Sequence, residues 1–287
     1  MQSGVQCLTI LLETLNIKVM ASLQTLQAMI LGIVQGLTEF LPVSSSAHLL
    51  LIPWMLGWEP MGLTFDVILH GGTLIALVIY FRHEWLQIIR QIFVSTKESR
   101  DYSLATPLMI GTFPAAIFGL FFDDLIEHQL RSPEIIVFTL FFFGLMLWAA
   151  DKRGSQKRGL QGLTGIDGLI IGLAQAMALV PGVSRSGITI TAALFLGISR
   201  ADSARFSFLL GTPIIAGATV LKLYDLLQTQ DMVMASSAPL VAGVLFSSIS
   251  GFLCIKYFLS FLRARTYLVF VIYRLVLAVF ILLLLVL

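Results

Sequence analysis

Long apolar segments follow one another along the whole chain, and they restrict what it can fold into. Hydrophobic residues fill 57% of the 287 positions and charged residues only 12%, whereas soluble domains carry about a quarter charged residues. Inside a bilayer every backbone N–H and C=O needs a partner within the protein, which helices of membrane-spanning length provide. The sequence therefore predicts an all-α polytopic membrane protein.

Two regions, 24–57 and 164–198, differ from the other apolar segments. Each is split by Pro and Ser into half-segments that are too short to cross about 30 Å of hydrocarbon. Interrupted segments at matching places in two halves of a membrane protein are typical of binding sites built from broken helices. We expect two re-entrant broken-helix pairs there. Six full transmembrane helices are expected over 64–82, 104–122, 134–150, 202–224, 238–260 and 266–287.

The two halves of the chain resemble each other. ILGIVQGLTEFLPVSSSA (30–47) aligns with IIGLAQAMALVPGVSRS (170–186), and ATPLMIGTFPAAIFGLFF (105–122) aligns with SAPLVAGVLFSSISGFLC (237–254). Two ordered matches at similar offsets indicate an internal duplication. The aligned pairs are Gly32 with Gly172, Gln35 with Gln175, after one gap Pro42 with Pro181 and Ser45 with Ser184, then Pro107 with Pro239, Gly111 with Gly243 and Gly119 with Gly251.

Basic residues lie mostly in alternate connections between the predicted spans. The connections over 82–100, 152–158, 200–205 and 256–265 are rich in Lys and Arg, whereas the connections between them hold only Arg131. The positive-inside rule places the basic connections in the cytoplasm. Each repeat then contains three full spans, so the second repeat is inverted and the broken pairs enter from opposite faces to meet near the midplane.

These patterns divide the chain into an N-terminal extension (1–23), repeat 1 (24–150), a basic cytoplasmic linker (151–163) and inverted repeat 2 (164–287). The first nineteen residues make a poor signal peptide, because they lack a basic start and a small-residue cleavage site. Translation from Met1 with an ordered amphipathic extension and translation from Met20 stay open as alternatives. A net charge of +2 gives no indication of nucleic-acid binding.

Polar residues gather in the first broken pair. Gln35 and Glu39 are four apart on the first half-helix, so they share a face and can point at a common ligand or ion. A carboxylate at membrane depth costs about 2.5–3.5 kcal/mol even on insertion scales, and such a group lines a cavity or finds a partner. The structural alternative is a Glu39 paired with a buried Arg.

Three serines, Ser44, Ser45 and Ser46, fall where the second half-helix begins. One serine suits an N-cap, but three exceed that need. Free N–H groups and about half a positive charge at a helix N-terminus make an anion site. His48 returns to the same helix face near Ser44 and Ser45, although a lone His is also compatible with a satisfied core residue.

The second broken pair contains PGVSRSG (181–187), where Ser184 and Ser186 place hydroxyls at another half-helix start. The guanidinium of Arg185 suits forked recognition of phosphate. A salt bridge to Glu39 is its structural alternative, and both can hold. Arg274, inside the last span, is a weaker candidate for the same anion.

Together the two clusters predict an anion-binding centre with acid–base groups near the midplane of the membrane. Lipid surrounds such a centre. Its natural substrate is therefore an amphiphile with an anionic head, in contact with membrane lipids.

The motifs resemble those of a known family. QGLTEFLPVSSSAH is similar to the first signature of the bacitracin-resistance type undecaprenyl-diphosphate phosphatases, and PGVSRSG followed by an apolar helix is similar to the second. The resemblance runs from about Met20 to the C-terminus and includes SFLLGTPIIAGA (207–218) and IYR (272–274). It implies hydrolysis of undecaprenyl diphosphate to undecaprenyl phosphate at the outer face of the bacterial cytoplasmic membrane, which recycles the carrier lipid for cell-wall synthesis.

The resemblance also implies a divalent cation, Mg²⁺ or Ca²⁺, and roles for individual residues. The family's acidic motif corresponds to Gln35 and Glu39, its proposed serine nucleophile to Ser45, its histidine to His48 and its phosphate-binding arginine to Arg185. Gln35 stands where many members have a second Glu. Because Gln offers only a neutral carbonyl, a two-carboxylate metal site is in question, and Glu39 with Gln35 is the expected metal-binding pair. Two smaller departures are Ser46 in place of the usual Thr and Ala47 in place of the usual Gly.

Phosphoryl-transfer chemistry assigns these groups a mechanism. Ser45 or a water attacks the terminal phosphorus, Glu39 orients the nucleophile or binds the metal, and His48 carries the proton. The hydroxyls of Ser44, Ser46, Ser184 and Ser186 assist in substrate binding. The main rival is a lipid-phosphate transporter or flippase, which would use the same anion site without a nucleophile. The oligomeric state is not given by the sequence, so a homodimer stays an alternative.

Overall fold

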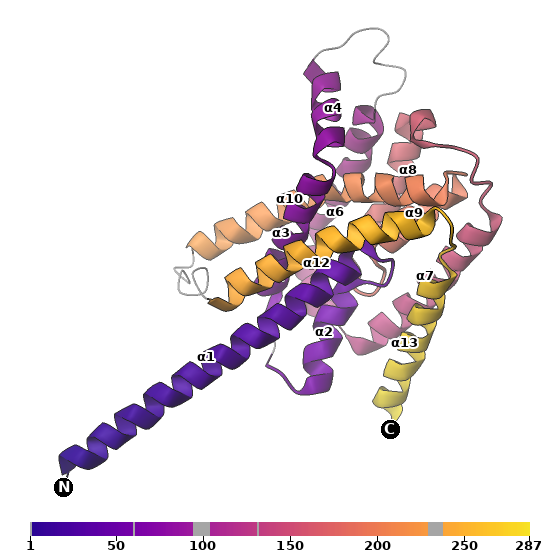
Figure 1. The fold of residues 1–287 in the computed structure, drawn as a ribbon. Helices are drawn as coiled ribbons and strands as arrows, with labels where there is room; N and C mark the ends of the chain where they lie inside the picture. Colours follow the sequence, from indigo (N-terminus) through magenta and orange to yellow (C-terminus); the bar gives the residue numbers. More distant parts are fainter. Residues whose placement is uncertain (1, 60, 94–103, 131, 229–237) are drawn as a thin grey trace.

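The structure, a computed structural model, describes residues 2–59, 61–93, 104–130, 132–228 and 238–287. Over these residues the chain is helical, with short connections (Figure 1). The elements are α1 Gln2–Phe40, α2 Ser45–Leu56, α3 Leu63–Tyr80, α4 Arg82–Phe93, α6 Ala105–Gln129, α7 Pro133–Arg153, the 3₁₀-helix η1 Leu160–Gly162, α8 Gly165–Met177, α9 Arg185–Phe195, α10 Arg200–Gln228, α12 Ala238–Leu262 and α13 Leu268–Val286.

The helices have the lengths and surfaces of a polytopic membrane protein. Many outward-facing side chains are apolar, for example Leu120 and Phe121 on α6, and lipid rather than water suits such a surface. Helix α3 joins α4 at an angle of 77°. Taken together, this bent pair is long and apolar enough to count as one further candidate span. Within the described part of the chain, five helices could cross a membrane alone: Met20–Phe40, Pro133–Arg153, Arg200–Tyr224, Ala238–Leu262 and Leu268–Val286.

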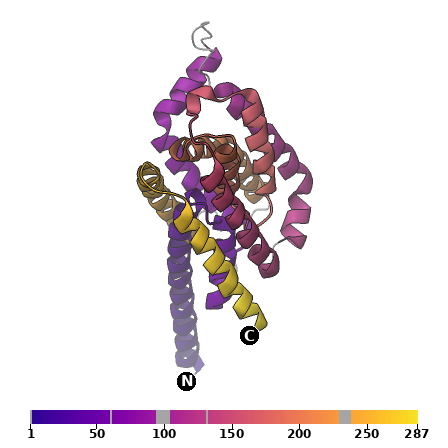
Figure 2. The same ribbon diagram turned by 90° about the vertical axis from the view of Figure 1, so that its right-hand side faces the viewer.

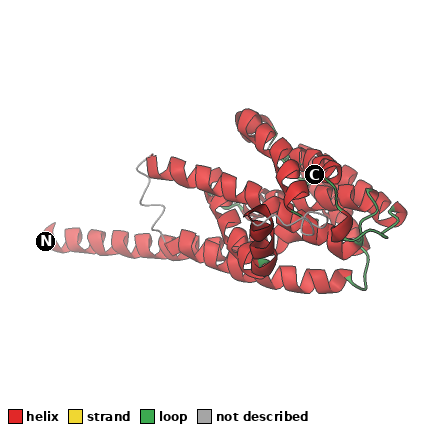
Figure 3. Ribbon diagram, turned by 90° about the horizontal axis from the view of Figure 1, so that it is seen from above, coloured by secondary structure: helices red, strands yellow, loops and turns green. Residues whose placement is uncertain are grey.

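The first half-helix is longer than the sequence predicted. We expected a short segment beginning near residue 24, but α1 is continuous from Gln2 to Phe40 and extends beyond the other helices (Figures 1 and 3). Between Gly4 and Gly32 the sequence has neither Gly nor Pro, so nothing ends the helix in this stretch. Its section Met20–Phe40 is therefore long and apolar enough to count as a candidate span.

The other three half-helices are short, as predicted, and two matching turns join them to their partners. Helices α2, α8 and α9 have 12, 13 and 11 residues. Ser44 and Ser184 precede α2 and α9 with positive φ angles of 74° and 73°, which is rare for residues other than Gly. Each hydroxyl caps its helix by accepting from a backbone N–H three residues later, at 3.4 and 3.1 Å.

This equivalence corrects the predicted alignment by one residue. Ser184 matches Ser44, not Ser45, and no gap is needed between the two motifs. In both turns the capping serine with its positive φ marks where the short helix starts. Relative to that serine, the proline lies one residue earlier in the second turn than in the first. Pairing Pro42 with Pro181 therefore shifted the predicted alignment by one residue. The first residues of α2 and α9, Ser45 and Arg185, therefore occupy equivalent positions.

Glycines allow two equivalent helix pairs to approach closely. Helix α1 packs along α12, and α8 packs along α6. A Cβ added to Gly32 would overlap the carbonyl oxygen of Gly243, and one added to Gly172 would overlap that of Gly111. Small residues at helix crossings permit this approach inside a membrane. The two contacts join the positions that the sequence alignment pairs, and each places a broken pair against a helix of the other half.

Candidate active site

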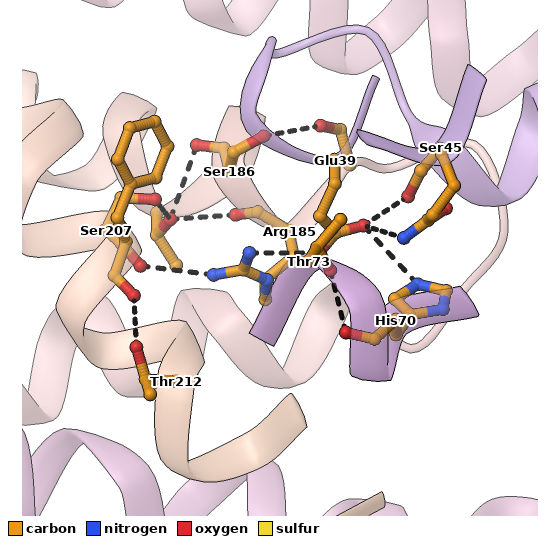
Figure 4. Close-up of polar contacts among 12 residues, drawn as sticks. Glu39, Ser45, His70, Thr73, Arg185, Ser186, Ser207 and Thr212 are labelled. Atoms are coloured by element: carbon orange, nitrogen blue, oxygen red, sulfur yellow. Dashed lines mark hydrogen bonds and ion pairs between the residues drawn. The ribbon is translucent and has the colours of Figure 1, made fainter. Parts of the chain in front are cut away.

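Glu39 joins the two broken-helix turns. It lies in the last turn of α1 and is only 5% exposed. Its Oε2 accepts hydrogen bonds from Gln35 Nε2 at 3.1 Å and from the Ser45 hydroxyl at 2.6 Å. Its Oε1 accepts from Arg185 Nη2 at 3.0 Å (Figure 4). The predictions that Gln35 shares a face with Glu39, and that the two serine-rich clusters meet, are confirmed by these contacts.

Ser45 is the first residue of α2, so its side chain lies at a helix N-terminus. Its hydroxyl points to the Glu39 carboxylate rather than to the backbone. A serine whose proton faces a carboxylate has an acceptor for that proton, which is what activation of a hydroxyl nucleophile requires. Ser44 meanwhile caps the helix, so the two neighbouring serines serve different purposes.

Helix α10 positions the guanidinium of Arg185. Nη1 donates to the carbonyl oxygen of Ser207 at 3.1 Å, and the Ser207 hydroxyl lies 2.6 Å from that of Thr189. At Gly211 an added Cβ would overlap the guanidinium, so only glycine leaves room for it. Nε is buried and has no hydrogen-bond partner within the described residues. Glu39 and Ser207 therefore each engage one N–H of Arg185, and the Nε–H is not used by either of them.

The remaining serines build the turns. The Ser44 and Ser46 hydroxyls are 3.2 Å apart, and the Ser184 and Ser186 hydroxyls are 3.3 Å apart. Ser186 also donates to the carbonyl oxygen of Leu41, which ties the start of α9 to the first turn. The predicted placement of all four at helix starts is confirmed, and their part in substrate binding stays a prediction.

His48 is bonded away from the Glu39 network. Its Nδ1 lies 2.7 Å from the carbonyl oxygen of Ser44, and its Nε2 lies 2.6 Å from the hydroxyl of Tyr273 on α13. The ring stacks on Tyr273 with 5.7 Å between centroids. A carbonyl only accepts hydrogen bonds, so Nδ1 carries a proton and Nε2 faces the tyrosine. The expected place near Ser44 is confirmed, whereas contact with Ser45 or Glu39 is not made in this arrangement.

Arg274 is fully buried and bonds only to backbone carbonyl groups in the described structure. A guanidinium has five N–H donors, and each of the five in Arg274 has an acceptor. Helix α13 packs beside α7 (Figure 2). The acceptors lie on α7 and on both broken-helix turns, so Arg274 of α13 holds the two turns against α7. The carbonyl groups belong to Thr139, Leu140, Pro42, Gly182 and Val183, at 3.0–3.3 Å. No N–H of Arg274 is left over in this arrangement, and its contribution to binding an anion stays a prediction.

His70, a residue outside the sequence predictions, also reaches Glu39. It comes from α3, and its Nε2 lies 3.3 Å from Glu39 Oε2 (Figure 4). Its Nδ1 is bonded to the carbonyl oxygen of Asp66 at 2.7 Å. The sequence offered one signal for a functional role of this residue, which is a histidine inside the apolar segment 64–82, followed by Gly71 and Gly72. The two serine motifs gave no reason to connect it with Glu39.

Fold and site together define a polytopic membrane protein with a buried polar centre of carboxylate, hydroxyl and guanidinium groups. Comparison with known proteins gives the family. The model described as bacitracin resistance protein BacA matches residues 28–280, and the chain belongs to this family.

Several relatives in this family are similar over most of their length. A protein named undecaprenyl-diphosphatase from Elusimicrobium minutum is 50% identical over 257 residues, which cover 90% of this chain and 96% of the relative. Proteins of the same name from Moorella thermoacetica and Saccharophagus degradans are 49% and 48% identical over 88% of this chain and 95% of each relative.

Replacing Arg274 should destabilise the protein. In Arg274→Met, buried carbonyl groups of both turns lose their donors, and an unsatisfied buried acceptor costs about 1–3 kcal/mol. We expect a clearly lower thermal unfolding midpoint in detergent. Arg265→Met removes an exposed arginine from the connection before α13 and is the control. Equal midpoints for the two variants would show that Arg274 does not hold the turns.

Proposed function

We propose that this protein hydrolyses undecaprenyl diphosphate to undecaprenyl phosphate and inorganic phosphate in the bacterial cytoplasmic membrane. The observation that carries the proposal is the double contact of Glu39, which meets a serine hydroxyl on one oxygen and an arginine on the other. A potential nucleophile, its proton acceptor and a phosphate-binding group are thus within one hydrogen-bonded unit. The relatives' name, undecaprenyl-diphosphatase, gives the substrate.

The diphosphate would bind between the two helix starts. Arg185 offers its free Nε, and the N-termini of α2 and α9 add N–H groups and partial positive charge. Arg274 lies behind both turns and has no carboxylate partner within the described residues, so its charge also favours an anion here. In phosphoryl transfer, positioning and charge neutralisation supply most of the catalysis.

The attacking group is Ser45 or a water that it orients. In either case Glu39 accepts the proton of the attacking O–H, the new P–O bond forms at the terminal phosphorus, and the bond to the bridging oxygen breaks. Undecaprenyl phosphate then leaves. If Ser45 attacks, a water must afterwards hydrolyse the phosphoserine to release phosphate. His48 stays the predicted proton carrier, and it would first have to exchange its contact with Tyr273.

A divalent cation, Mg²⁺ or Ca²⁺, fits the residues beside Ser45. Gln35 Oε1 is buried and has no hydrogen-bond partner within the described residues, and the Glu39 carboxylate is next to it. Hard cations prefer such oxygen ligands. Gln35 and Glu39 would hold the ion, which when bound would neutralise charge on the diphosphate.

The inverted-repeat topology completes the proposal. Two repeats of three spans, each with a broken pair, would bring the turns together from opposite faces, with the site open to the outer face. The matching serine caps and the two equivalent glycine contacts support this arrangement, as does the distribution of basic residues. A lipid transporter is less favoured, because it has no need of a serine bonded to a carboxylate.

Arg185→Ala should abolish most phosphate release from a C55 prenyl diphosphate by purified, detergent-solubilised protein. Loss of one group that stabilises transition-state charge costs about 10²–10³-fold in rate. Arg205→Ala is a matched control, because Arg205 makes an ion pair of the same length, 3.0 Å, with Glu84, at the more exposed contact of α10 with α4. Surface pairs of this kind contribute little. Similar activity in the two variants would rule out the proposed site.

The variant Ser45→Ala distinguishes attack by the Ser45 hydroxyl from attack by a water molecule. If Ser45 is the nucleophile, the variant loses turnover and no phosphoprotein can be trapped from radiolabelled substrate. If Ser45 only orients a water, we expect residual turnover reduced by about 10- to 100-fold, as for loss of one hydrogen bond to a charged group. Activity at the wild-type level would remove Ser45 from both roles.

Removing divalent cations should stop the reaction. We expect EDTA to abolish phosphate release and Mg²⁺ or Ca²⁺ to restore it. In Gln35→Leu the cation loses one oxygen ligand, so a higher cation concentration should be needed for half-maximal activity. An unchanged cation requirement in this variant would contradict the role of Gln35.

A further inference from the structure

Glu39 has one polar contact from outside the two serine motifs. Gln35 and Ser45 donate to its Oε2 from the first broken pair, and Arg185 binds its Oε1 from the second. His70 approaches the same Oε2 from α3, with its Nε2 at 3.3 Å (Figure 4). The carboxylate is therefore held from three separate parts of the chain.

The His70 ring has little freedom to turn. Its Nδ1 is bonded to the carbonyl oxygen of Asp66, one turn earlier on α3. This contact at the far nitrogen aims Nε2 at Glu39. Second hydrogen bonds that fix a ring in this way are a common means of positioning histidines at functional sites.

Helix α3 is itself held in place by α12 next to His70. The Ser247 hydroxyl of α12 donates to the carbonyl oxygen of Leu69 at 2.8 Å. A Cβ added to Gly72 would overlap the backbone of Val244 and the side chain of Ser247, so the two helices touch directly beside His70. The ring is thus carried by a helix whose depth and rotation are set by packing.

We propose that His70 is a positioning residue that keeps the Glu39 carboxylate divided between Ser45 and Arg185. A carboxylate beside a guanidinium tends to form a forked pair in which both oxygens face the arginine. Both nitrogens of the His70 ring face acceptor oxygens, so the ring carries a proton on each. Gln35 and His70 together hold Oε2 away from the forked arrangement, which leaves it available to the Ser45 hydroxyl. Without His70 the carboxylate would turn toward Arg185, and Ser45 would lose its proton acceptor.

This inference rests on the proposed function and makes a separate kinetic prediction. A positioning role affects the chemical step, so kcat should fall while KM changes little. Direct contact with substrate is the alternative, since the His70 side chain is 25% exposed. That role would raise KM instead.

Two amides test the position of the ring nitrogen. In His70→Gln the side-chain NH₂ falls near the place of Nε2, whereas in His70→Asn it reaches only the place of Nδ1. The two variants have the same chemistry and differ by one methylene group. His83→Asn, an exposed histidine on α4, is the control. Phosphate release from a C55 prenyl diphosphate gives kcat and KM, and thermal unfolding in detergent reports on the fold.

We expect His70→Asn to lower kcat by about 10- to 100-fold, the effect of losing one polar contact with a charged group, with KM near the wild-type value. His70→Gln should recover most of this loss. Equal activity of the two amide variants, or a rise in KM alone, would overturn the inference. An inactive wild type would overturn the proposed function together with the inference, whereas an active wild type with unaffected variants would overturn the inference alone.

Discussion

The buried pair of Glu39 and Arg185 is the interaction on which the rest of the structure depends. A carboxylate and a guanidinium are both costly at membrane depth, and each reduces the cost of the other. The two residues are far apart in the sequence and lie at the ends of helices from opposite halves of the chain. Their contact therefore requires the two broken-helix turns to meet, and the surrounding glycine contacts and carbonyl bonds keep them together.

One backbone frame is used twice for two different purposes. Both turns place a serine with positive φ before a short helix and a second serine two residues later. Between these serines the first turn carries Ser45 and the second carries Arg185. A duplicated frame thus supplies a hydroxyl from one half and a cation from the other, and Glu39 from the first half contacts both. The single polar centre arises from unequal side chains at equivalent positions.

Much of this arrangement could be predicted from the sequence, because the relevant signals are local. Pro and Ser inside apolar segments located the turns, and the four-residue spacing of Gln35 and Glu39 gave their shared face. Contacts between residues that are far apart in the sequence give no such local signal. Nothing near His70 indicated that α3 would bring it to Glu39, and the position of Arg274 inside a span did not reveal that five carbonyl groups would surround it. Packing between helices that are distant in the sequence determines both the contact of His70 with Glu39 and the surroundings of Arg274.

The position of Arg274 in the last helix has a consequence for how the protein is made. Both turns depend on donors of a side chain that the ribosome adds only after all of the residues around Glu39 have been translated. The carbonyl groups of Pro42 and Gly182 can be satisfied by this side chain only when α13 has entered the bilayer. Completion of the centre is therefore coupled to insertion of α13, and a nascent chain without α13 carries an incomplete centre.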